Sequence, residues 1–326
     1  MKADIVVLDG DSIAFEVAAA CEQTGILVTN TTNEVQSSFK TRTEMKHFLS
    51  GLEVPEGHYT IEDTQIAEDK RNAFSTVKSK LQNYRDKFQT ENIEIYITGS
   101  GNFREDIPLP SRYKSNRDGK RRPLLLSDIK DYLIKYQGAV VVYGDEADAL
   151  LTQRMWDGYK SGQVIVASNG DKDIRQGSGI LHNPNTDEIL HIDGFGDIYL
   201  TEQGKMKGHG RKWLYAQIAL GDKQTDGFCP RDIAEAAFGK RPAGGDKSFY
   251  KLLHPATNDK EAFIVLANLY KSWFGEEPFT YTAWNGDYVT TNWIGAMQMI
   301  WDCAYMRRWE GDKPQVKDIM KKMGII

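Results

Sequence analysis

The sequence has few cysteines, and their positions exclude two classes of site. Cys21, Cys229 and Cys303 are the three cysteines among 326 residues. An odd number of widely spaced cysteines fits neither a disulfide framework nor a zinc site. Long apolar runs are also missing, so we expect no membrane span. Asp4 and Asp9 interrupt the apolar run near the N-terminus, which argues against a signal peptide. Together these absences predict a soluble, cytoplasmic protein.

Positive charge is not in excess either. The formal net charge is −5, with 40% hydrophobic and 27% charged residues, a composition typical of a soluble globular enzyme. An acidic total excludes attraction of an anionic partner by the field of the whole molecule. Any such partner must therefore be bound by a local basic patch. The length allows one large domain, or one domain with an appendage.

Acidic residues follow two short apolar runs near the middle of the chain. Residues 139–143 and 164–167 are rich in β-branched side chains and predict buried parallel strands, and residues 147–156 between them have helical spacing. The acids that follow the two runs are Asp145, Glu146, Asp148, Asp171 and Asp173. Ligand sites lie at the carboxyl ends of parallel strands, and clustered carboxylates repel one another unless a cation lies among them. The stretch therefore predicts a magnesium site.

Two further acidic pairs lie at the ends of apolar segments. Asp9 and Asp11 follow the apolar run 5–8, and Asp222 and Asp226 follow an expected helix over 213–220. Asp11 by itself is equally well explained as the N-cap of the next helix. An all-oxygen donor set selects Mg²⁺ or Mn²⁺ over zinc. Two such ions about 4 Å apart can activate a water and stabilise the leaving oxygen in phosphodiester hydrolysis.

A basic segment follows an expected strand over residues 93–98. Residues 103–123 hold seven basic and three acidic side chains, a local charge of +4. One interpretation is a solvated basic loop. The other, favoured by the position directly after a strand of the same sheet, is a nucleic-acid contact in which cations grip phosphates and Tyr113 stacks on a base. Lys114 or Arg104 would then neutralise charge that develops on the scissile phosphate.

The segments before and after this core are less informative. We expect a β-hairpin from residues 26–29 and 34–39, a short helix over 43–52 that ends at Gly51 and Pro55, and a long amphipathic helix over 66–88. No chemistry is assigned to residues 26–60. After Asp173 we expect an antiparallel pair, 180–182 with 189–192, in which His182 and His191 are ordinary strand residues. Residues 203–212 are rich in Gly and Lys and predict an exposed linker.

Helices are expected to dominate from residue 213 onward. The first two, over 213–220 and 231–238, flank a Gly-containing turn, and Lys240 and Arg241 follow them. A helix–turn–helix with basic flanks is a common way to bind the backbone of duplex DNA. Further helices are expected over 262–273, 291–308 and 313–323. Trp293, Trp301 and Tyr305 have helical spacing and are expected in the core.

Five motifs, in this order, resemble the 5′-nuclease or flap-endonuclease family. They are VVLDGDS, FREDIPLPSRYKSNR, GDEAD, ASNGDKD and ALGDKQTDG. The family includes bacteriophage 5′–3′ exonucleases and the 5′-nuclease domain of bacterial DNA polymerase I, and the phage members are the nearer likeness. The resemblance covers about residues 1–245. Each motif alone is modest, but five in order are specific.

The resemblance implies an α/β fold with a PIN-like, mostly parallel central sheet flanked by helices. A nuclease domain over residues 1–205 would carry a helical arch at about 103–125. A helical region over 206–326 would carry a helix–three-turn–helix at about 213–247, followed by C-terminal helices. The implied activity is Mg²⁺- or Mn²⁺-dependent hydrolysis of DNA, or of RNA in RNA–DNA hybrids, from a 5′ end or at a flap. A monomer in the host cytoplasm, acting in phage replication or recombination, would fit these features.

The implied site has three groups of residues. The metal-binding carboxylates would be Asp9, Glu146, Asp148, Asp171, Asp173, Asp222 and Asp226, with Asp11 as a further candidate. The residues that contact nucleic acid would be Tyr113, Arg117, Lys120, Arg121, Arg122, Gly221, Gly227, Lys240 and Arg241, and Lys114 matches the arch motif together with Tyr113 and Arg117. The turn from Gly221 to Gly227 matches the one that in relatives also holds a monovalent cation, K⁺, through backbone carbonyls.

The sequence departs from the family pattern at three places. Thr98 stands where relatives usually carry an Asp before the arch, and Ala149 stands where many have a second Asp after the EAD. The last acidic pair, Asp222 and Asp226, is spaced by four residues instead of three. We expect Asp11 to compensate for the missing acid near Thr98.

Two alternatives explain part of the pattern. VVLDGDS followed by GDKQTD also resembles the first and last motifs of haloacid-dehalogenase-type phosphatases, with Asp9 as the nucleophile and Asp11 as its acid–base partner. That reading leaves the basic segment and the GDEAD and GDKD motifs unexplained. The other alternative is a non-catalytic binder of branched DNA, which the acidic pairs argue against because clustered carboxylates repel phosphate.

Overall fold

The computed structural model describes residues 1–52 and 57–326. Pro55, the predicted stop of a helix, lies outside the described residues. Contacts divide the chain into two compact units, which we call the sheet unit and the hairpin unit. The sheet unit comprises Met1–Gly10, Tyr84–Lys120 and Gly138–Ile326, and the hairpin unit comprises Asp11–Asn83 and Arg121–Gln137. This division differs from the predicted boundary at residue 205, because the helices after that residue pack in the same unit as the central sheet.

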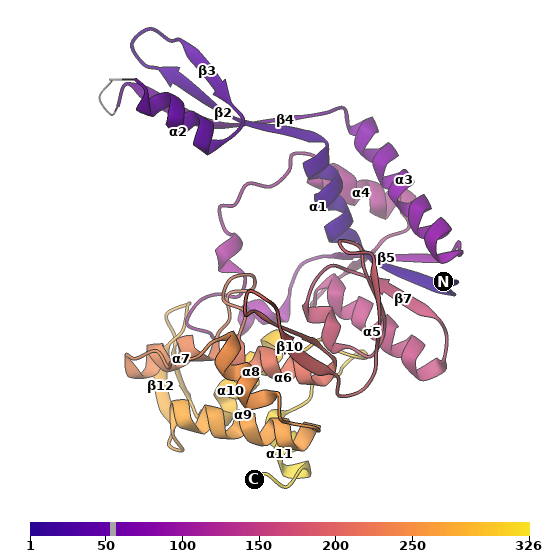
Figure 1. Cartoon of the computed structure of the whole chain (residues 1–326), viewed down its shortest axis with the longest axis vertical. Helices are drawn as coiled ribbons and strands as arrows, with labels where there is room; N and C mark the ends of the chain where they lie inside the picture. Colours follow the sequence, from indigo (N-terminus) through magenta and orange to yellow (C-terminus); the bar gives the residue numbers. More distant parts are fainter. Residues whose placement is uncertain (53–56) are drawn as a thin grey trace. The chain divides into compact units, whose positions relative to one another are not determined.

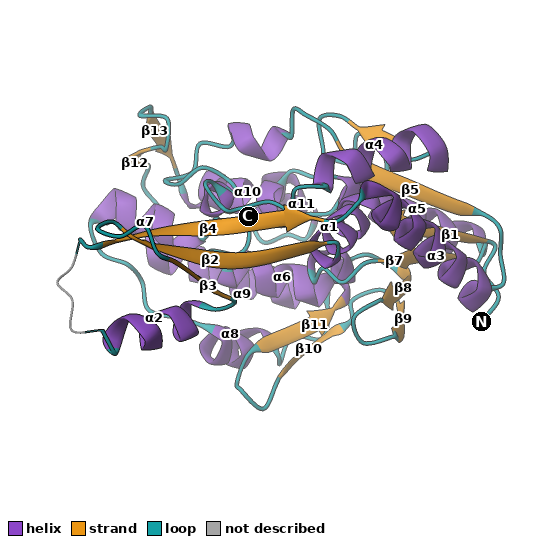
Figure 2. Cartoon of the chain, turned by 90° about the horizontal axis from the view of Figure 1, so that it is seen from above, coloured by secondary structure: helices purple, strands orange, loops and turns teal. Residues whose placement is uncertain are grey.

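The sheet unit is built on a six-stranded sheet of order β6-β5-β1-β7-β8-β9. Its strands are β1 (Ile5–Asp9), β5 (Ile93–Thr98), β6 (Val140–Val142), β7 (Ile165–Ser168), β8 (Gly179–Asn183) and β9 (Glu188–Ile192). All neighbours are parallel except β9, which runs antiparallel to β8, and Figure 2 shows the strands of the sheet in orange. The predicted mostly parallel sheet is confirmed. The two predicted central strands both form, but β5 and β1 lie between them.

Helix α5 (Ala147–Ser161) covers the middle of this sheet. Its Leu151 and Met155 are fully buried in a cluster with Val7 of β1 and Ile165 of β7. The helix continues past the predicted end at residue 156, and Gly162 ends it in the left-handed conformation, with φ 77°. Because α5 begins where β6 ends, its first turn lies at the carboxyl edge of the parallel strands.

The second half of the sheet unit is mainly helical (Figure 1). Its helices are α6 (Gly210–Leu220), α7 (Pro230–Phe238), α8 (Asp246–Leu253), α9 (Asp259–Phe274), α10 (Trp293–Ala304) and α11 (Val316–Lys322). They share one large core, in which Trp293 and Trp301 are buried as expected and Tyr305 packs at its margin. Helix α10 is shorter than predicted, because Asn292 caps its start and Tyr305 leaves the helix with extended backbone.

Two hairpins in this region were not predicted. One pairs β10 (Asp197–Leu200) with β11 (Met206–His209), and the other pairs β12 (Phe279–Thr282) with β13 (Tyr288–Thr291). The predicted exposed linker over 203–212 is therefore wrong. Its residues form β11 and the start of α6, and Lys212 is buried, bonded to Asp197 at 3.0 Å and to the His254 carbonyl at 2.9 Å.

The hairpin unit holds a three-stranded antiparallel sheet of order β3-β2-β4. Its elements are α1 (Gly10–Ala20), β2 (Glu22–Asn30), β3 (Gln36–Phe39), α2 (Arg42–Ser50), β4 (Tyr59–Ala67), the start of α3 (Lys70–Phe88), and α4 (Leu126–Gln137). Met45 of α2 packs on Ile26 and Val28 of β2. The predicted hairpin is confirmed, but β4 was missed. The long helix consequently begins at Lys70 instead of residue 66.

The predicted helical arch over 103–125 is wrong. The described chain there contains 3₁₀ turns at Phe103–Asp106 and Ser115–Arg117 and is otherwise irregular until α4 begins. Pro108 and Pro110 remove backbone donors that a helix needs. Among the described residues, no helix combines the length and apolarity required to cross a bilayer.

Candidate metal centre

The predicted metal-binding acids of the sheet unit lie in loops and helix starts that follow its apolar segments. Asp9 ends β1, Glu146 and Asp148 stand at the start of α5, and Asp171 and Asp173 follow β7. Asp222 and Asp226 lie in the loop between α6 and α7. The carboxyl ends of parallel strands meet at one edge of a sheet, and this is why residues from distant parts of the chain are brought together there.

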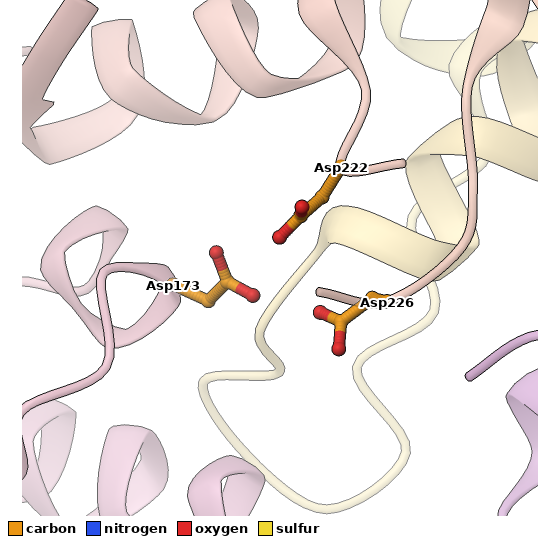
Figure 3. Close-up of side chains that lie close together, drawn as sticks. All are labelled: Asp173, Asp222 and Asp226. Carbon is orange, nitrogen blue, oxygen red and sulfur yellow. The ribbon is translucent and has the colours of Figure 1, made fainter. Parts of the chain in front are cut away.

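Three of these acids form a compact cluster. One carboxylate oxygen each of Asp173, Asp222 and Asp226 lies within 4.8 Å of the others, and Figure 3 shows the three side chains converging. The Gln217 side chain donates to Asp173, and the Thr225 N–H donates to Asp222 at 3.1 Å. The cluster is therefore held in place by neighbouring donors.

Asp148 belongs to a second acidic group beside the first. Burial raises its pKa well above the usual range, and the charges of Asp9, Asp171 and Glu146 raise it further. The Asn169 side-chain amide donates to Asp148 at 2.5 Å. The Asp173 N–H donates to Asp171 at 2.9 Å, which links the two groups.

The acids carry more negative charge than their surroundings offset. Burial raises the pKa of Asp173 well above its usual range, and the charges of Asp171 and Asp226 add to the effect. The pKa of Asp226 is also raised, chiefly by burial, although Lys114 acts against it. Buried carboxylates that favour protonation in this way are stabilised in their charged form by a bound cation.

The donor set fits Mg²⁺ or Mn²⁺. Every donor is oxygen, which these hard cations prefer. The three oxygens of Asp173, Asp222 and Asp226 lie within 4.8 Å of one another, so these side chains are close enough to hold one cation together.

Cations from the basic segment contact the acids. Lys114 has left-handed backbone, φ 58°, and its N–H donates to the Asp226 carbonyl at 2.7 Å. Its ammonium pairs with Glu146 and lies 3.7 Å from Asp226, and Arg117 pairs with Asp226 at 3.0 Å. Burial acts to lower the pKa of Lys114, but Glu146 and Asp226 outweigh it and raise the pKa. Burial acts to raise the pKa of Glu146, and Lys114 and Arg104 bring it below the usual range.

Two predicted site residues are corrected by the structure. Arg104 is 1% exposed and donates to Asp145 at 2.6 Å and to the carbonyls of Cys303 and Tyr305. Tyr113 is 3% exposed and its ring lies parallel to that of Phe228. Neither side chain presents a surface to a phosphate or a base, so both have structural roles.

Other predicted residues lie away from the cluster or in the hairpin unit. Asp11 is in the first turn of α1 and pairs with Lys130 at 2.5 Å, so its role as a ligand stays a prediction. In the hairpin unit, Arg121 reaches the Thr64 carbonyl, and the Arg122 carbonyl accepts from Gln65. The remaining basic residues are placed as follows: Lys120 and Lys240 are exposed, and Arg241 pairs with Asp232 and Glu235.

The loop between α6 and α7 needs glycine at both predicted positions. Gly221 has φ +73°, and a Cβ there would lie 2.7 Å from the Phe228 carbonyl oxygen. Gly227 has φ +79°, and a Cβ there would lie 3.4 Å from the Lys114 nitrogen. Backbone carbonyls of this loop accept from Asn116 and from Lys114. The K⁺ site therefore stays a prediction.

Several contacts at the site were not predicted. Thr98 accepts the Ala147 N–H at 3.0 Å, so it satisfies an N-terminal donor of α5. Asn102 donates to Glu146 at 2.9 Å, and Lys172 pairs with Asp222 at 2.5 Å. Lys172 and Asn169 both lie inside the ASNGDKD motif, which was the available signal for them.

A pocket of about 450 Å³ adjoins the cluster through Asp222. Its charged lining comprises the cations Lys172, Arg175, Lys205, Lys207, Lys223 and Arg231 and the acids Asp222 and Asp246. Cations from the β10–β11 hairpin, from the loop after β7 and from α7 therefore face one space. Such a lining attracts anions next to the acidic cluster.

Comparison with known proteins gives matches in structure only. No family model matches the sequence, and no curated protein matches it. A D15 flap endonuclease variant of bacteriophage T5, in a pseudo-enzyme-product complex with DNA and metal ions, aligns with TM-score 0.51 and 11% identity over 98% of this chain and 97% of that chain. The T5 D15 protein co-crystallised with metal ions aligns with TM-score 0.49 and 11% identity over 98% and 96%. The alignment at TM-score 0.51 shows a shared fold and confirms the predicted fold class.

Proposed function

We propose that the protein is a metal-dependent nuclease that hydrolyses DNA from the 5′ side. The observation that carries the proposal is the convergence of acids from β1, α5, the loop after β7 and the α6–α7 loop, with Lys114 paired to two of them. The shared fold with the T5 D15 flap endonuclease, whose structure contains DNA and metal ions, supports it. The motif order in the sequence supports it independently.

The acids would hold Mg²⁺ or Mn²⁺, and we propose that two such ions bind. Bound divalent ions supply an activated water and stabilise the leaving oxygen in phosphodiester hydrolysis. The ligands would be Asp9, Glu146, Asp148, Asp171, Asp173, Asp222 and Asp226. The chain's own contribution is to fix these oxygens with donors such as Gln217 and Asn169.

Lys114 would contact the scissile phosphate. In this structure its ammonium pairs with Glu146 and Asp226, and a metal ion bound by those carboxylates would compete for them. The ammonium would then be free to neutralise charge on the reacting phosphate. Arg117 is placed to make a second phosphate contact from the same segment.

The α6–α7 loop and the adjoining basic pocket would bind the phosphodiester backbone of the duplex. Backbone N–H groups at the start of α7 and the cations of the pocket suit this contact. Lys240 and Arg241, directly after α7, would extend it. We include 5′ flaps and RNA in RNA–DNA hybrids among the proposed substrates, and a role in phage replication or recombination.

End-labelled substrates test the proposal. A duplex labelled at its 5′ or 3′ end, a 5′-flap substrate and an RNA–DNA hybrid would each be incubated with Mg²⁺, with Mn²⁺ or with EDTA. We expect release of label from the 5′ side that requires the metal. If no metal-dependent release from the 5′ side occurs on any substrate, the proposal is wrong.

Matched variants separate the alternatives. Asp171→Ala should abolish cleavage, whereas Asp157→Asn should leave it unchanged, because Asp157 is half exposed near the other end of α5 from Asp148. A non-catalytic binder of branched DNA predicts that Asp171→Ala behaves like the parent in every assay. Rapid turnover of p-nitrophenyl phosphate without nuclease activity would instead favour the phosphatase.

A further inference from the structure

The last two residues of α10 and the three that follow it lie against the supports of two acidic loops. Helix α10 ends at Ala304, and the last carbonyls of a helix have no partner within it. Here the carbonyls of Cys303 and Ala304 accept from Arg104 and Gln176, at 3.2 and 2.8 Å. The segment 303–307 is therefore anchored by side chains from the loop after β5 and the loop after β7.

The first anchor leads to Glu146. Arg104 also donates to the Tyr305 carbonyl at 3.1 Å and to Asp145 at 2.6 Å. The Arg307 guanidinium lies 3.2 Å from the other oxygen of Asp145 and 4.1 Å from the Phe103 ring centroid. Asp145 in turn accepts the Glu146 N–H at 2.8 Å. Two guanidinium groups therefore fix the carboxylate that fixes the backbone of Glu146.

The second anchor leads to Asp173. The Gln176 side chain donates to the Ala304 carbonyl and accepts the Met306 N–H at 3.0 Å. It also donates to the side-chain oxygen of Gln217, Oε1, at 3.5 Å, and the side-chain nitrogen of Gln217 donates to Asp173. Gln176 and Gln217 are 6% and 3% exposed, so water does not replace these contacts easily.

We propose that the segment 303–307 is a shared brace, with Arg307 and Gln176 as positioning residues that orient Glu146 and Asp173 for metal binding. The proposal rests on the metal site of the proposed function. Its physical basis is burial: Arg104 is 1% exposed and the Asp145 side chain 8%, and a fully bonded polar network in such surroundings admits one geometry. Loss of contacts that orient metal ligands typically costs about 10–100-fold in metal affinity or activity.

Paired variants of the full-length chain test the brace. Arg307→Met removes the second cation on Asp145 while keeping bulk beside Phe103, and Gln176→Leu removes the link to Asp173. Arg308→Met and Gln298→Leu are the matched controls. Arg308 pairs with Asp312, and Gln298 joins α10 to the start of α11 by accepting the Val316 N–H at 2.7 Å. Among the contacts of the described residues, neither control side chain meets Arg104, Asp145, Gln176 or Gln217. Arg308 lies 5.9 Å from the centroid of the Tyr305 ring, so Gln298→Leu is the control that leaves the segment 303–307 untouched.

Three quantities are measured for each variant. Electron paramagnetic resonance gives the Mn²⁺ affinity without DNA, thermal unfolding in EDTA gives the melting temperature, and cleavage of the 5′-flap substrate gives kcat and KM. We expect both brace variants to bind Mn²⁺ about tenfold or more weakly, with lower kcat and unchanged KM. The controls should bind Mn²⁺ like the parent at comparable losses in melting temperature. Arg307→Lys keeps the cation and should recover most of the Mn²⁺ affinity, which keeps the test valid if Arg307→Met folds poorly.

The outcomes separate this inference from the proposed function. The brace is overturned if both brace variants bind Mn²⁺ as tightly as the parent, or if the controls lose as much Mn²⁺ affinity as the brace variants. This holds even if the parent cleaves DNA. A parent that binds Mn²⁺ but cleaves no DNA overturns the proposed function, while a selective loss of Mn²⁺ affinity in the brace variants still supports the brace. A parent that binds no Mn²⁺ overturns both.

Discussion

Asp173→Asn should make the metal-free protein more stable and at the same time remove its ability to bind metal. The substitution keeps the shape of the side chain and an oxygen that can accept from Gln217. It removes one negative charge from the cluster with Asp222 and Asp226. Because nothing in the described protein fully offsets that charge without a metal, its removal relieves repulsion in the folded state.

The magnitude follows from the spacing of the oxygens. At 4.8 Å, the limit within which the three oxygens lie, two unit charges repel by about 3.5 kcal/mol at an effective dielectric constant of about 20. Lys172 beside Asp222 and Arg117 beside Asp226 offset part of this, and partial protonation limits the rest. We therefore expect a gain of about 1–2 kcal/mol at pH 8, which corresponds to roughly 1.5–3 °C in melting temperature for a chain of 326 residues.

The gain should depend on pH in a defined direction. The pKa values of Asp148, Asp173 and Asp226 are raised in the folded state. The protonated form of these carboxyls therefore stabilises the folded state. This contribution is complete below the pKa of about 3.9 that Asp has in the unfolded chain, and it is lost as the pH rises through the higher pKa of the folded state. In EDTA the parent should consequently lose stability from weakly acidic pH toward pH 8, and Asp173→Asn should lose less.

Urea unfolding in EDTA and in Mg²⁺, at several pH values, provides the measurement. Saturating Mg²⁺ at about 100 times its dissociation constant adds about 2.7 kcal/mol to a protein that binds it only when folded, so the parent should gain and the variant should not. Asp157→Asn loses only an exposed ion pair with Arg154, so it should shift both curves equally and by less than about 1 kcal/mol. A variant no more stable than the parent in EDTA at pH 8 would refute the reasoning.

Three further outcomes are expected. Lys114→Ala should lower turnover about 10²–10³-fold and duplex binding only a few-fold, whereas an equal loss in cleavage and filter-binding assays would make Lys114 a grip residue. Gly221→Ala should cost more in urea unfolding than Gly239→Ala, by about 1–3 kcal/mol, because both have positive φ but Gly221 alone faces a backbone oxygen at 2.7 Å. Thr98→Val should cost about 1 kcal/mol because it removes an acceptor at the start of α5, whereas Thr98→Ser should cost less.

The central sheet and the acids were predictable because their signals are local. Strands β1, β6 and β7 are short runs rich in β-branched residues, and each candidate ligand lies at the end of a strand or helix or within a few residues after it. The order of the strands was harder to predict. Strands β6 and β7 follow one another across a single helix in the sequence, but β5 and β1 lie between them in the sheet. The order of strands depends on pairing between distant segments, which periodicity does not encode.

The main errors of the sequence-based prediction concerned polar strands, which were missed, and buried cations, which were assigned to the site. The sequence of β4 is YTIEDTQIA, which is too polar to predict a strand from its composition. It forms a strand because its backbone pairs with β2. Arg104 and Lys114 look alike within one basic segment, yet Arg104 is 1% exposed whereas the Lys114 side chain is 24% exposed. Composition cannot tell a guanidinium bound to Asp145 from a cation beside the cluster. The two roles differ only in the partner of each cation, and that partner comes from a distant loop of the chain.

The same reasoning explains why the C-terminal helices had no predicted role. Arg104 and Cys303 are 199 positions apart in the chain, and Gln176 and Ala304 are 128 apart. No motif marks 303–307, because the segment contributes mainly backbone carbonyls, which any residue offers. The ligands of a metal site must be particular side chains and therefore leave a pattern in the sequence. The backbone that orients them leaves none, so the role of 303–307 becomes visible only from its contacts with Arg104 and Gln176 in the folded chain.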